Sequence, residues 1–395
     1  MFIFQTESHA VALRDRLLKP KADHDKRLAH ELDTAAQNAL QKGPWSVVYN
    51  HAERRASNDP HDYYSEAPYW WPDPDNAAGP FIRRDGEVFP GRFNEHRREF
   101  VELSHTMLTL CAAGYLLDKH EYLDRAILLL DTWFVASKTR MNPDMQYAQA
   151  VKGICTGRCI GMIELGNLNR IVHAAAYLDG YAKASLTIEG LKHWLSEMLD
   201  WCLESEYGKA ESVNGNNHET CWNVHVGTYG AYLGRPEVLE LVCNNFKTRI
   251  LDQLAEDCSM PAELARTKSL NYSVLNLNAM AAICELGRHA EEDLWRYETT
   301  DGRGMQKAVR YLAPFLENPF LWEYPAIDGE QPIDCYALQM AAIRLNEPAY
   351  SRINQKRSSG MKLIRESKNP FGPLPLLQGW DGSSTALWID SDTGQ

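Results

Sequence analysis

The stretch NGNNHETCW, residues Asn214–Trp222, gathers neutral amide side chains around a single histidine. Asn and Gly favour turns and helix caps, so the stretch fits an ordinary loop that precedes a helix. It also fits a site for an oxygen-rich anionic group. Asn217 can donate N–H groups without carrying charge, and His218 beside it can take part in proton transfer. Both interpretations stay open at this stage.

A metal site is the alternative use of this histidine. His218 and His225 are seven residues apart, so they share one face if a helix begins near His218. Zinc needs a third protein ligand at suitable spacing, and the neighbouring sequence offers none. The sequence therefore predicts no metal, and we expect no cofactor.

Arg266 and Tyr272 form a second pair of interest. Six residues of ideal helix rotate by about 240°, so the two side chains would not share a helix face. A break in the helix between them could aim both at one cleft. Taken alone, the pair is more simply a surface arginine and a buried tyrosine.

Three consecutive aromatic residues, Tyr69, Trp70 and Trp71, lie in a proline-rich stretch. They could fill the core, or they could form a platform for the apolar face of a sugar ring. Arg83 and Arg84 follow, and guanidinium groups bind carboxylates in a bidentate manner. Aromatic rings beside arginines suit a sugar that bears a carboxylate. The further arginines Arg92, Arg97 and Arg98 follow. We expect at least two of these five arginines to lie simply on a solvated face.

Tyr147, Gln149 and Arg158 lie among glycines in the stretch QYAQAVKGICTGRCIG. The glycines could simply allow close packing of helices. The stretch does not match a phosphate-binding loop, which requires a GxxxxGK[ST] pattern after a strand. These three residues are therefore candidates for substrate contact only in combination with the others.

Helical periodicity dominates the elements that must position these residues. Helical hairpins are predicted in series over residues 101–118 with 121–137, 168–184 with 188–204, 222–235 with 236–257, and 270–288 with 304–317, and a last one begins at 335–346. The stretches 62–92 and 324–335 are irregular, and the tail 372–395 is predicted to be loosely held. We expect one all-α domain, residues 1–395, in which about six or seven hairpins form an (α/α) toroid.

The formal net charge is −12, and no long Lys/Arg run is present, which argues against nucleic-acid binding. No stretch approaches the roughly 20 apolar residues of a membrane span. The nine cysteines are irregularly spaced, which favours a reducing compartment. No signal peptide is visible at the start. We expect a cytoplasmic protein as written, or a periplasmic or secreted one if a signal was removed, of undetermined oligomeric state.

These motifs resemble those of the alginate-lyase-like polysaccharide lyases. YYSEAPYWWPDP with FIRRDG, YAQAVKG with GRCIGMIE, NGNNHETCW and ARTKSLNYS occur in the order of that family, with a best-matching core over residues 62–345. The resemblance implies an (α/α) toroid and β-elimination of a polyuronate. It assigns carboxylate neutralisation to Asn217 and Arg266 and the catalytic histidine and tyrosine to His218 and Tyr272. The expected substrate-binding residues are Tyr69, Trp70, Trp71, Arg83, Arg84, Tyr147, Gln149, Arg158 and Trp222.

Elimination removes the C5 proton of a uronate and expels the oxygen at C4. The proton becomes removable only when the neighbouring carboxylate is neutralised, which suits Asn217 and Arg266. In mannuronate and glucuronate the C5 proton and the C4 oxygen lie on one side, so Tyr272 could serve as base and then acid. In guluronate they lie on opposite faces, and His218 becomes the better-placed base. The expected partner is therefore an anionic polysaccharide such as alginate or β-1,4-glucuronan.

Two other classes of protein compete with this prediction. A glycoside hydrolase of the same architecture, acting on an acidic oligosaccharide, needs two carboxylic acids. The sequence offers Glu219, Asp328 and Asp334 for that role. A non-catalytic sugar-binding protein is the second alternative, and the presence of all four residues implied by the family argues against it.

Overall fold

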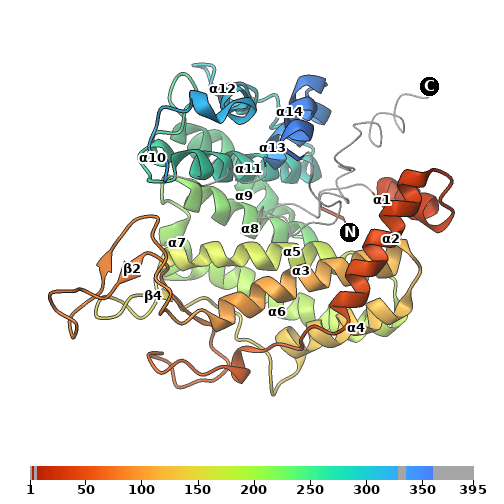
Figure 1. Ribbon diagram of the computed structural model, residues 1–395, viewed down its shortest axis with the longest axis horizontal. Helices are drawn as coiled ribbons and strands as arrows, with labels where there is room; N and C mark the ends of the chain where they lie inside the picture. The colour runs from red at the N-terminus through yellow and green to blue at the C-terminus, as the bar shows by residue number, and fades with distance from the viewer. Residues whose placement is uncertain (1, 4–6, 328–334, 359–395) are drawn as a thin grey trace. The chain divides into compact units, whose positions relative to one another are not determined.

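A computed structural model describes residues 2–3, 7–327 and 335–358. The chain is mostly helical, as predicted (Figure 1). It divides into two compact units. Unit 1 comprises residues 12–213, and unit 2 comprises residues 2–11 together with the chain from Asn214 onward. The predicted tail 372–395 and the residues Asp328 and Asp334 lie outside the described residues.

In unit 1 the long helix α3 (Glu95–Leu116) packs against α2 (Asp23–Ala39), α4 (His120–Leu130) and α5 (Gly166–Ala175). Phe100 of α3 stacks on Trp133 with ring centroids 5.3 Å apart, and both rings are fully buried. The α-helices that lie wholly in this unit are α2 (Asp23–Ala39), α3 (Glu95–Leu116), α4 (His120–Leu130), α5 (Gly166–Ala175), α6 (Ser185–Glu204) and α7 (Glu206–Glu211). Helix α1 (Glu7–Leu18) begins among residues assigned to unit 2 and ends among those of unit 1.

Four short strands also occur in unit 1, where the sequence indicated no strands. β1 (Tyr64–Glu66) pairs in parallel with β4 (Tyr147–Ala150), and β2 (Trp70–Trp71) pairs antiparallel with β3 (Ile82–Arg83). Strands of two to four residues are too short to show an alternating pattern, which explains why periodicity misses them. Three of the strands lie in the stretch 62–92, which was predicted to be irregular, and β4 lies in the stretch that precedes the glycines.

Unit 2 is built around two helices that pack against each other, α8 (Asn217–Leu233) and α11 (Ser269–Gly287). Both are buried on nearly all sides, as expected for central helices. A Cβ atom at Gly227 of α8 would lie 2.8 Å from a methyl group of Leu286, so glycine permits this close approach. The remaining helices are α9 (Pro236–Asn245), α10 (Pro261–Leu264), α12 (Met305–Glu317), α13 (Tyr336–Arg344) and α14 (Pro348–Ser358).

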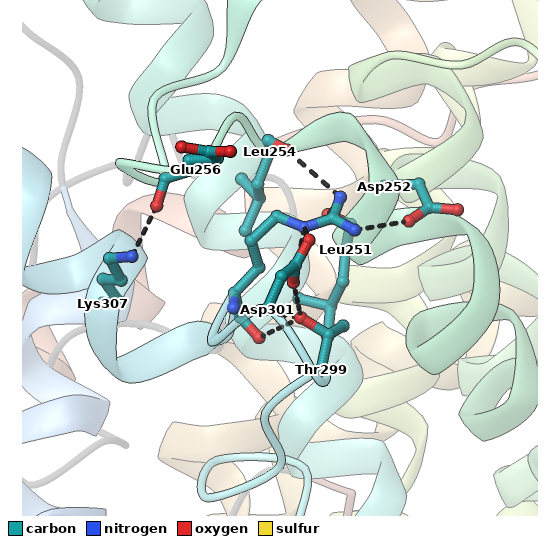
Figure 2. A network of polar contacts seen from close by, with 8 residues as sticks. Leu251, Asp252, Leu254, Glu256, Thr299, Asp301 and Lys307 are labelled. Atoms are coloured by element: carbon teal, nitrogen blue, oxygen red, sulfur yellow. Dashed lines mark hydrogen bonds and ion pairs between the residues drawn. The ribbon is translucent and has the colours of Figure 1, made fainter.

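The turn between α9 and α10 is held by a polar network around Arg303 (Figure 2). The Arg303 guanidinium donates to the carbonyl oxygens of Leu251 and Leu254 at 3.0 and 3.3 Å, and it pairs with Asp252 at 3.1 Å. Asp301 accepts from its Nε, and Lys307 donates to the carbonyl oxygen of Glu256 at 2.5 Å. These contacts fix the backbone that leads into α10, which carries part of the candidate site.

Most of the predicted helices are confirmed, although several differ in extent. The helix predicted over 168–184 ends at Ala175, before Gly180, whose φ is +84°. The helix predicted over 236–257 ends as an α-helix at Asn245 and continues as a π-helical turn over Phe246–Ile250. None of the described helices is long and apolar enough to cross a membrane. None of the nine cysteines, all of which lie among the described residues, forms a disulfide, and all are buried except Cys155 and Cys159.

Candidate active site

The asparagine-rich stretch forms the capped N-terminus of α8. Asn216 is the N-cap, and its side-chain oxygen accepts from the His218 backbone N–H at 2.9 Å. The Glu219 side chain reaches back to accept from Gly215 N–H at 2.7 Å, and Gly215 adopts a left-handed φ of +75°. Part of the crowding of asparagines is thus explained by helix capping, since these bonds satisfy donors that have no partner within the helix. The helix begins at Asn217, five residues before the start of the helix predicted over 222–235, so His218 and His225 lie on the same helix.

Asn217, the first residue of α8, is held by an acid from α10. Its backbone N–H donates to Glu263 Oε1 at 2.8 Å, and its side-chain Nδ2 donates to Glu263 Oε2 at 2.7 Å. Both residues are 1% exposed. Burial raises the pKa of the Glu263 carboxyl, against the opposing effects of the two bonds from Asn217 and of the positive charges of Arg266 and His218. Glu263 therefore lies within the electrostatic reach of three of the four predicted catalytic residues, and sequence analysis did not identify it.

Arg266 and Tyr272 are in direct contact. Arg266 Nη2 donates to the Tyr272 hydroxyl at 2.7 Å, and the guanidinium carbon lies 3.8 Å from the centre of the Tyr272 ring. Arg266 belongs to the turn between α10 and α11, whereas Tyr272 lies in the first turn of α11. The helix break that the spacing required is therefore present. Both side chains are half-buried, so they remain open to a ligand.

His218 follows Asn217 in the first turn of α8 and is half-buried. His225, on the same helix, is fully buried, and burial together with the charge of His218 lowers the pKa of His225 to about 3. It belongs to the core, where its ring lies nearly parallel to that of Tyr229. Trp222 is also in this helix and is 3% exposed, so it offers little surface to a sugar. Its predicted contact with substrate stays a prediction.

The predicted aromatic platform lies in unit 1, on the β2–β3 hairpin. Trp70 pairs with Arg83, and the Arg84 backbone N–H donates to the Tyr69 carbonyl oxygen at 2.8 Å. The Arg84 guanidinium lies 5.0 Å from the centre of the Trp71 ring. The three aromatic side chains are half-buried, so they neither fill a core fully nor lie free in solvent.

Gln149 and Arg158 contact each other in unit 1, and Arg158 also lies near Trp70 of the β2–β3 hairpin. Arg158 Nη2 donates to Gln149 Oε1 at 2.8 Å, and its guanidinium carbon lies 6.0 Å from the centre of the Trp70 ring. Gln149 has a left-handed φ of +52°, a strained backbone for a residue with a Cβ atom. Its N–H donates to Ser65 Oγ at 2.9 Å, and Ser65 in turn donates to the buried Glu164 carboxylate at 2.8 Å. Such strain held by buried polar groups is common at functional sites.

Other residues of the predicted arginine and aromatic set are placed differently. Arg83 is exposed and pairs with Asp85 at 2.8 Å, and Arg98 is exposed, so these two have the solvated positions that the sequence allowed. Arg97 Nε lies 3.7 Å from Glu164 Oε1, the carboxylate that also accepts from Ser65 beside Gln149. Tyr147 packs against an apolar cluster that includes Tyr64 and Ala150.

A cavity of about 490 Å³ opens in unit 1 beside the β1–β4 pair. It is lined by Tyr64, Glu66, Arg54 and residues 150–156, and the Glu66 carboxylate there is occupied by both Arg54 Nε and Nη2 at 2.6 Å. Among the described residues no group of three or more His, Cys, Asp or Glu side chains gathers as a metal site.

Comparison with known proteins identifies the family. The family model described as alginate lyase matches residues 46–322, more than half of the chain. The chain belongs to the alginate lyase family. This alginate lyase family member is therefore an enzyme, a polysaccharide lyase, as the sequence motifs predicted.

Solved structures agree with the family assignment. An alginate lyase from Bacteroides ovatus is 26% identical with a TM-score of 0.81, and the match covers 90% of this chain and 95% of that one. An alginate lyase from Sphingomonas species is 15% identical with a TM-score of 0.57 over 93% of both chains. A variant of the latter enzyme, complexed with a tetrasaccharide, is 14% identical with a TM-score of 0.55 over 85% of this chain and 86% of that one. The Sphingomonas structures support the fold alone, and no curated protein matches the sequence.

Proposed function

We propose that this lyase cleaves a 1,4-linked polyuronate by β-elimination, with Tyr272 as base and acid and with Asn217, His218 and Arg266 neutralising the uronate carboxylate. The observation that carries the proposal is the 2.7 Å contact from Arg266 Nη2 to the Tyr272 hydroxyl. A cation against a phenolic oxygen favours the ionised form of that oxygen, which is the form that accepts a proton. The amide of Asn217 lies in the same unit, fixed by Glu263.

The chemistry balances with these groups alone. The ionised Tyr272 oxygen takes the C5 proton, and the electron pair of the C–H bond moves toward the carboxyl group, where N–H donors stabilise the enolate-like charge. The C4–O bond then breaks, a C4–C5 double bond forms, and the departing oxygen takes the proton from Tyr272. One residue can serve both steps only where the proton and the leaving oxygen lie on the same side, as in mannuronate and glucuronate.

The substrate class proposed is alginate, in its polymannuronate form, or β-1,4-glucuronan. These two sugars differ only at C2, so the elimination groups do not distinguish them. Half-buried tryptophans with guanidinium groups against their rings, at Trp70 and Trp71, suit the binding of carboxylated sugars. The tetrasaccharide complexed with the Sphingomonas enzyme supports an oligosaccharide ligand. Closure of the helices into an (α/α) toroid of about six or seven hairpins is part of this proposal.

The alternative hydrolase would require two carboxylic acids free to act on a glycosidic bond. Glu219 does not suit this task, because it is 1% exposed and its oxygens accept from Arg249 Nε at 2.6 Å and Gly215 N–H at 2.7 Å. Of the three acids that the sequence offers for this role, Glu219 is thus the one that the structure disfavours, whereas Asp328 and Asp334 lie outside the described residues.

The test is ultraviolet absorbance with time for purified protein on polymannuronate, polyguluronate and β-1,4-glucuronan in separate samples. A rise on polymannuronate or glucuronan, and none on polyguluronate, is expected for the same-side route. A rise on polyguluronate alone would transfer the role of base to His218. Release of reducing ends without any absorbance change would instead establish hydrolysis and overturn the proposal.

A further inference from the structure

Glu263 is a buried acid that contacts Asn217 on α8 and the backbone of Arg266 in the turn before α11. It lies in α10, a single helical turn that begins with Pro261 at its first position. Proline is favoured there because its φ suits a helix and its missing N–H needs no partner. The Glu263 carboxylate accepts from the backbone N–H of Asn217 at 2.8 Å and from its side-chain Nδ2 at 2.7 Å, while the Glu263 carbonyl oxygen accepts from the Arg266 backbone N–H at 3.1 Å. Glu263 therefore holds the side-chain amide of Asn217 and the backbone of Arg266, two of the three residues proposed to neutralise the substrate carboxylate.

The carboxylate also determines which way the Asn217 amide faces. An ionised carboxylate only accepts hydrogen bonds, so the amide must present nitrogen, and not oxygen, to Glu263. One hydrogen of Nδ2 is used in this bond and the other is left for a ligand. Asn217 Oδ1 is buried and has no hydrogen-bond partner among the described residues. A buried polar atom without a partner typically destabilises a protein by about 1–3 kcal/mol, so the retention of this amide orientation requires a compensating contact, which Glu263 supplies to Nδ2.

The charges around Glu263 are consistent with an ionised acid at this position. Arg266, from the turn before α11, and His218, from α8, both favour its negative form. The N-terminus of α8 adds the positive end of a helix dipole. Burial acts in the opposite direction. The acid is thus surrounded by the groups that the elimination uses, although its own oxygens are occupied by Asn217.

We infer that Glu263 is a positioning residue for the elimination: it fixes the Asn217 amide so that its remaining N–H faces the uronate carboxylate. This inference rests on the proposed function. Glu263 acts through Asn217 and takes no proton from the substrate. Its loss should therefore lower kcat more than it raises KM, because the amide is needed most when negative charge develops on the carboxyl group.

Glu263→Gln in the full-length enzyme is the central variant. Gln keeps the size of the side chain, but its NH2 group turns one of the two acceptors into a donor that opposes an N–H of Asn217. We expect kcat to fall about tenfold to a hundredfold, compared with about a hundredfold to a thousandfold for Asn217→Ala, the range seen when one oxyanion donor is removed. Glu256→Gln makes the same chemical change at an exposed position of unit 2 and is the matched control.

A double-mutant cycle separates positioning from a merely structural role. If Glu263 acts through Asn217, then Glu263→Gln should change kcat by less than about twofold in an Asn217→Ala background. If it only stabilises the helix end, the two effects should multiply. Glu263→Asp provides a second check, since it keeps two acceptors on a shorter side chain and should retain more activity than the Gln variant. The Asp variant also keeps the test available if the Gln variant does not fold.

The outcomes are distinct from those that concern the proposed function. Wild-type protein that produces no ultraviolet-absorbing product on any of the three polymers refutes the proposed function and this inference with it. Active wild type with a fully active Glu263→Gln variant, or with effects that multiply in the cycle, refutes the inference alone. A Gln variant more active than the Asp variant would also refute it, because the acceptor pair would then be dispensable.

Discussion

Replacing Tyr272 by Phe removes a single oxygen atom from the centre of the proposed mechanism. That oxygen accepts one described hydrogen bond, from Arg266 Nη2 at 2.7 Å. The aromatic ring remains, and the guanidinium group 3.8 Å from its centre keeps its ring contact. The change therefore tests the hydroxyl group while it preserves most of the local packing.

The expected magnitudes differ sharply between activity and stability. Loss of a general base and acid lowers turnover by about a hundredfold to ten-thousandfold, which corresponds to about 2.7–5.5 kcal/mol in the activation free energy. The lost hydrogen bond joins two half-buried side chains, so its effect on the free energy of unfolding should be about 1 kcal/mol. In a chain of this size that shifts Tm by about 2 °C or less.

The assay is the initial rate of ultraviolet absorbance increase on the best polymer, with Tm measured on the same preparation. Tyr311→Phe is the matched control, since Tyr311 lies in the same unit and its hydroxyl is hydrogen-bonded to Tyr324. A Tyr272→Phe enzyme within threefold of the wild-type rate would exclude Tyr272 as base and acid. A loss of rate accompanied by an equal loss in the Tyr311→Phe control would point to damage to the fold instead.

Three further predictions follow from the structure. His218→Ala should lower kcat by at least about tenfold with little change in Tm, and a near-normal rate would remove His218 from the mechanism. Trp70→Ala should raise KM for polymer about threefold to tenfold if its ring binds a sugar, whereas a large loss of Tm with unchanged KM would make it a core residue. Stability should fall as the pH drops from about 6.5 toward 4, because burial lowers the pKa of His96 to about 4 and of His225 to about 3, so the unfolded chain binds protons that the folded chain does not. Each histidine should lower the free energy of unfolding by on the order of 1–2 kcal/mol between pH 7 and pH 5. Measurement of Tm from pH 7 to pH 4.5 checks this prediction. A constant Tm would contradict the burial of these rings in neutral form.

The helices were predictable because their apolar periodicity is long and their ends carry recognisable residues. For example, α8 ends at Gly234, which is left-handed, and α9 begins with Pro236. A glycine after a helix and a proline at the start of the next one are common sequence signals of helix ends. The N-terminal helix α2 was not predicted, although apolar residues such as Leu28 and Leu32 lie four apart and are fully buried. The apolar spacing of this segment is itself typical of a buried helix face.

The candidate site was only partly predictable, because one of its residues is far from its partner in the sequence. The residues of NGNNHETCW are consecutive, and Arg266 and Tyr272 are six apart, so their types and spacing mark them. Glu263 has no such mark, because its partner Asn217 is 46 positions earlier in the chain. An acid two residues after a proline is common in surface turns, so its residue type alone indicates no function. Only the folded backbone brings its carboxylate to the start of α8.

The contacts of Glu263 also define a sequence signature by which other members of the family can be sorted. The acid, the arginine three residues later and the tyrosine six residues after that occupy one short segment, while the asparagine and histidine occupy another. The expected signature is thus an Asn-His pair followed by Glu-x-x-Arg-x5-Tyr. A homologue that keeps the helices but has an uncharged residue at the acid position would be expected to orient its asparagine differently. Such sequences would be natural experiments on this inference, and a change in the acid without a change in catalysis among them would count against it.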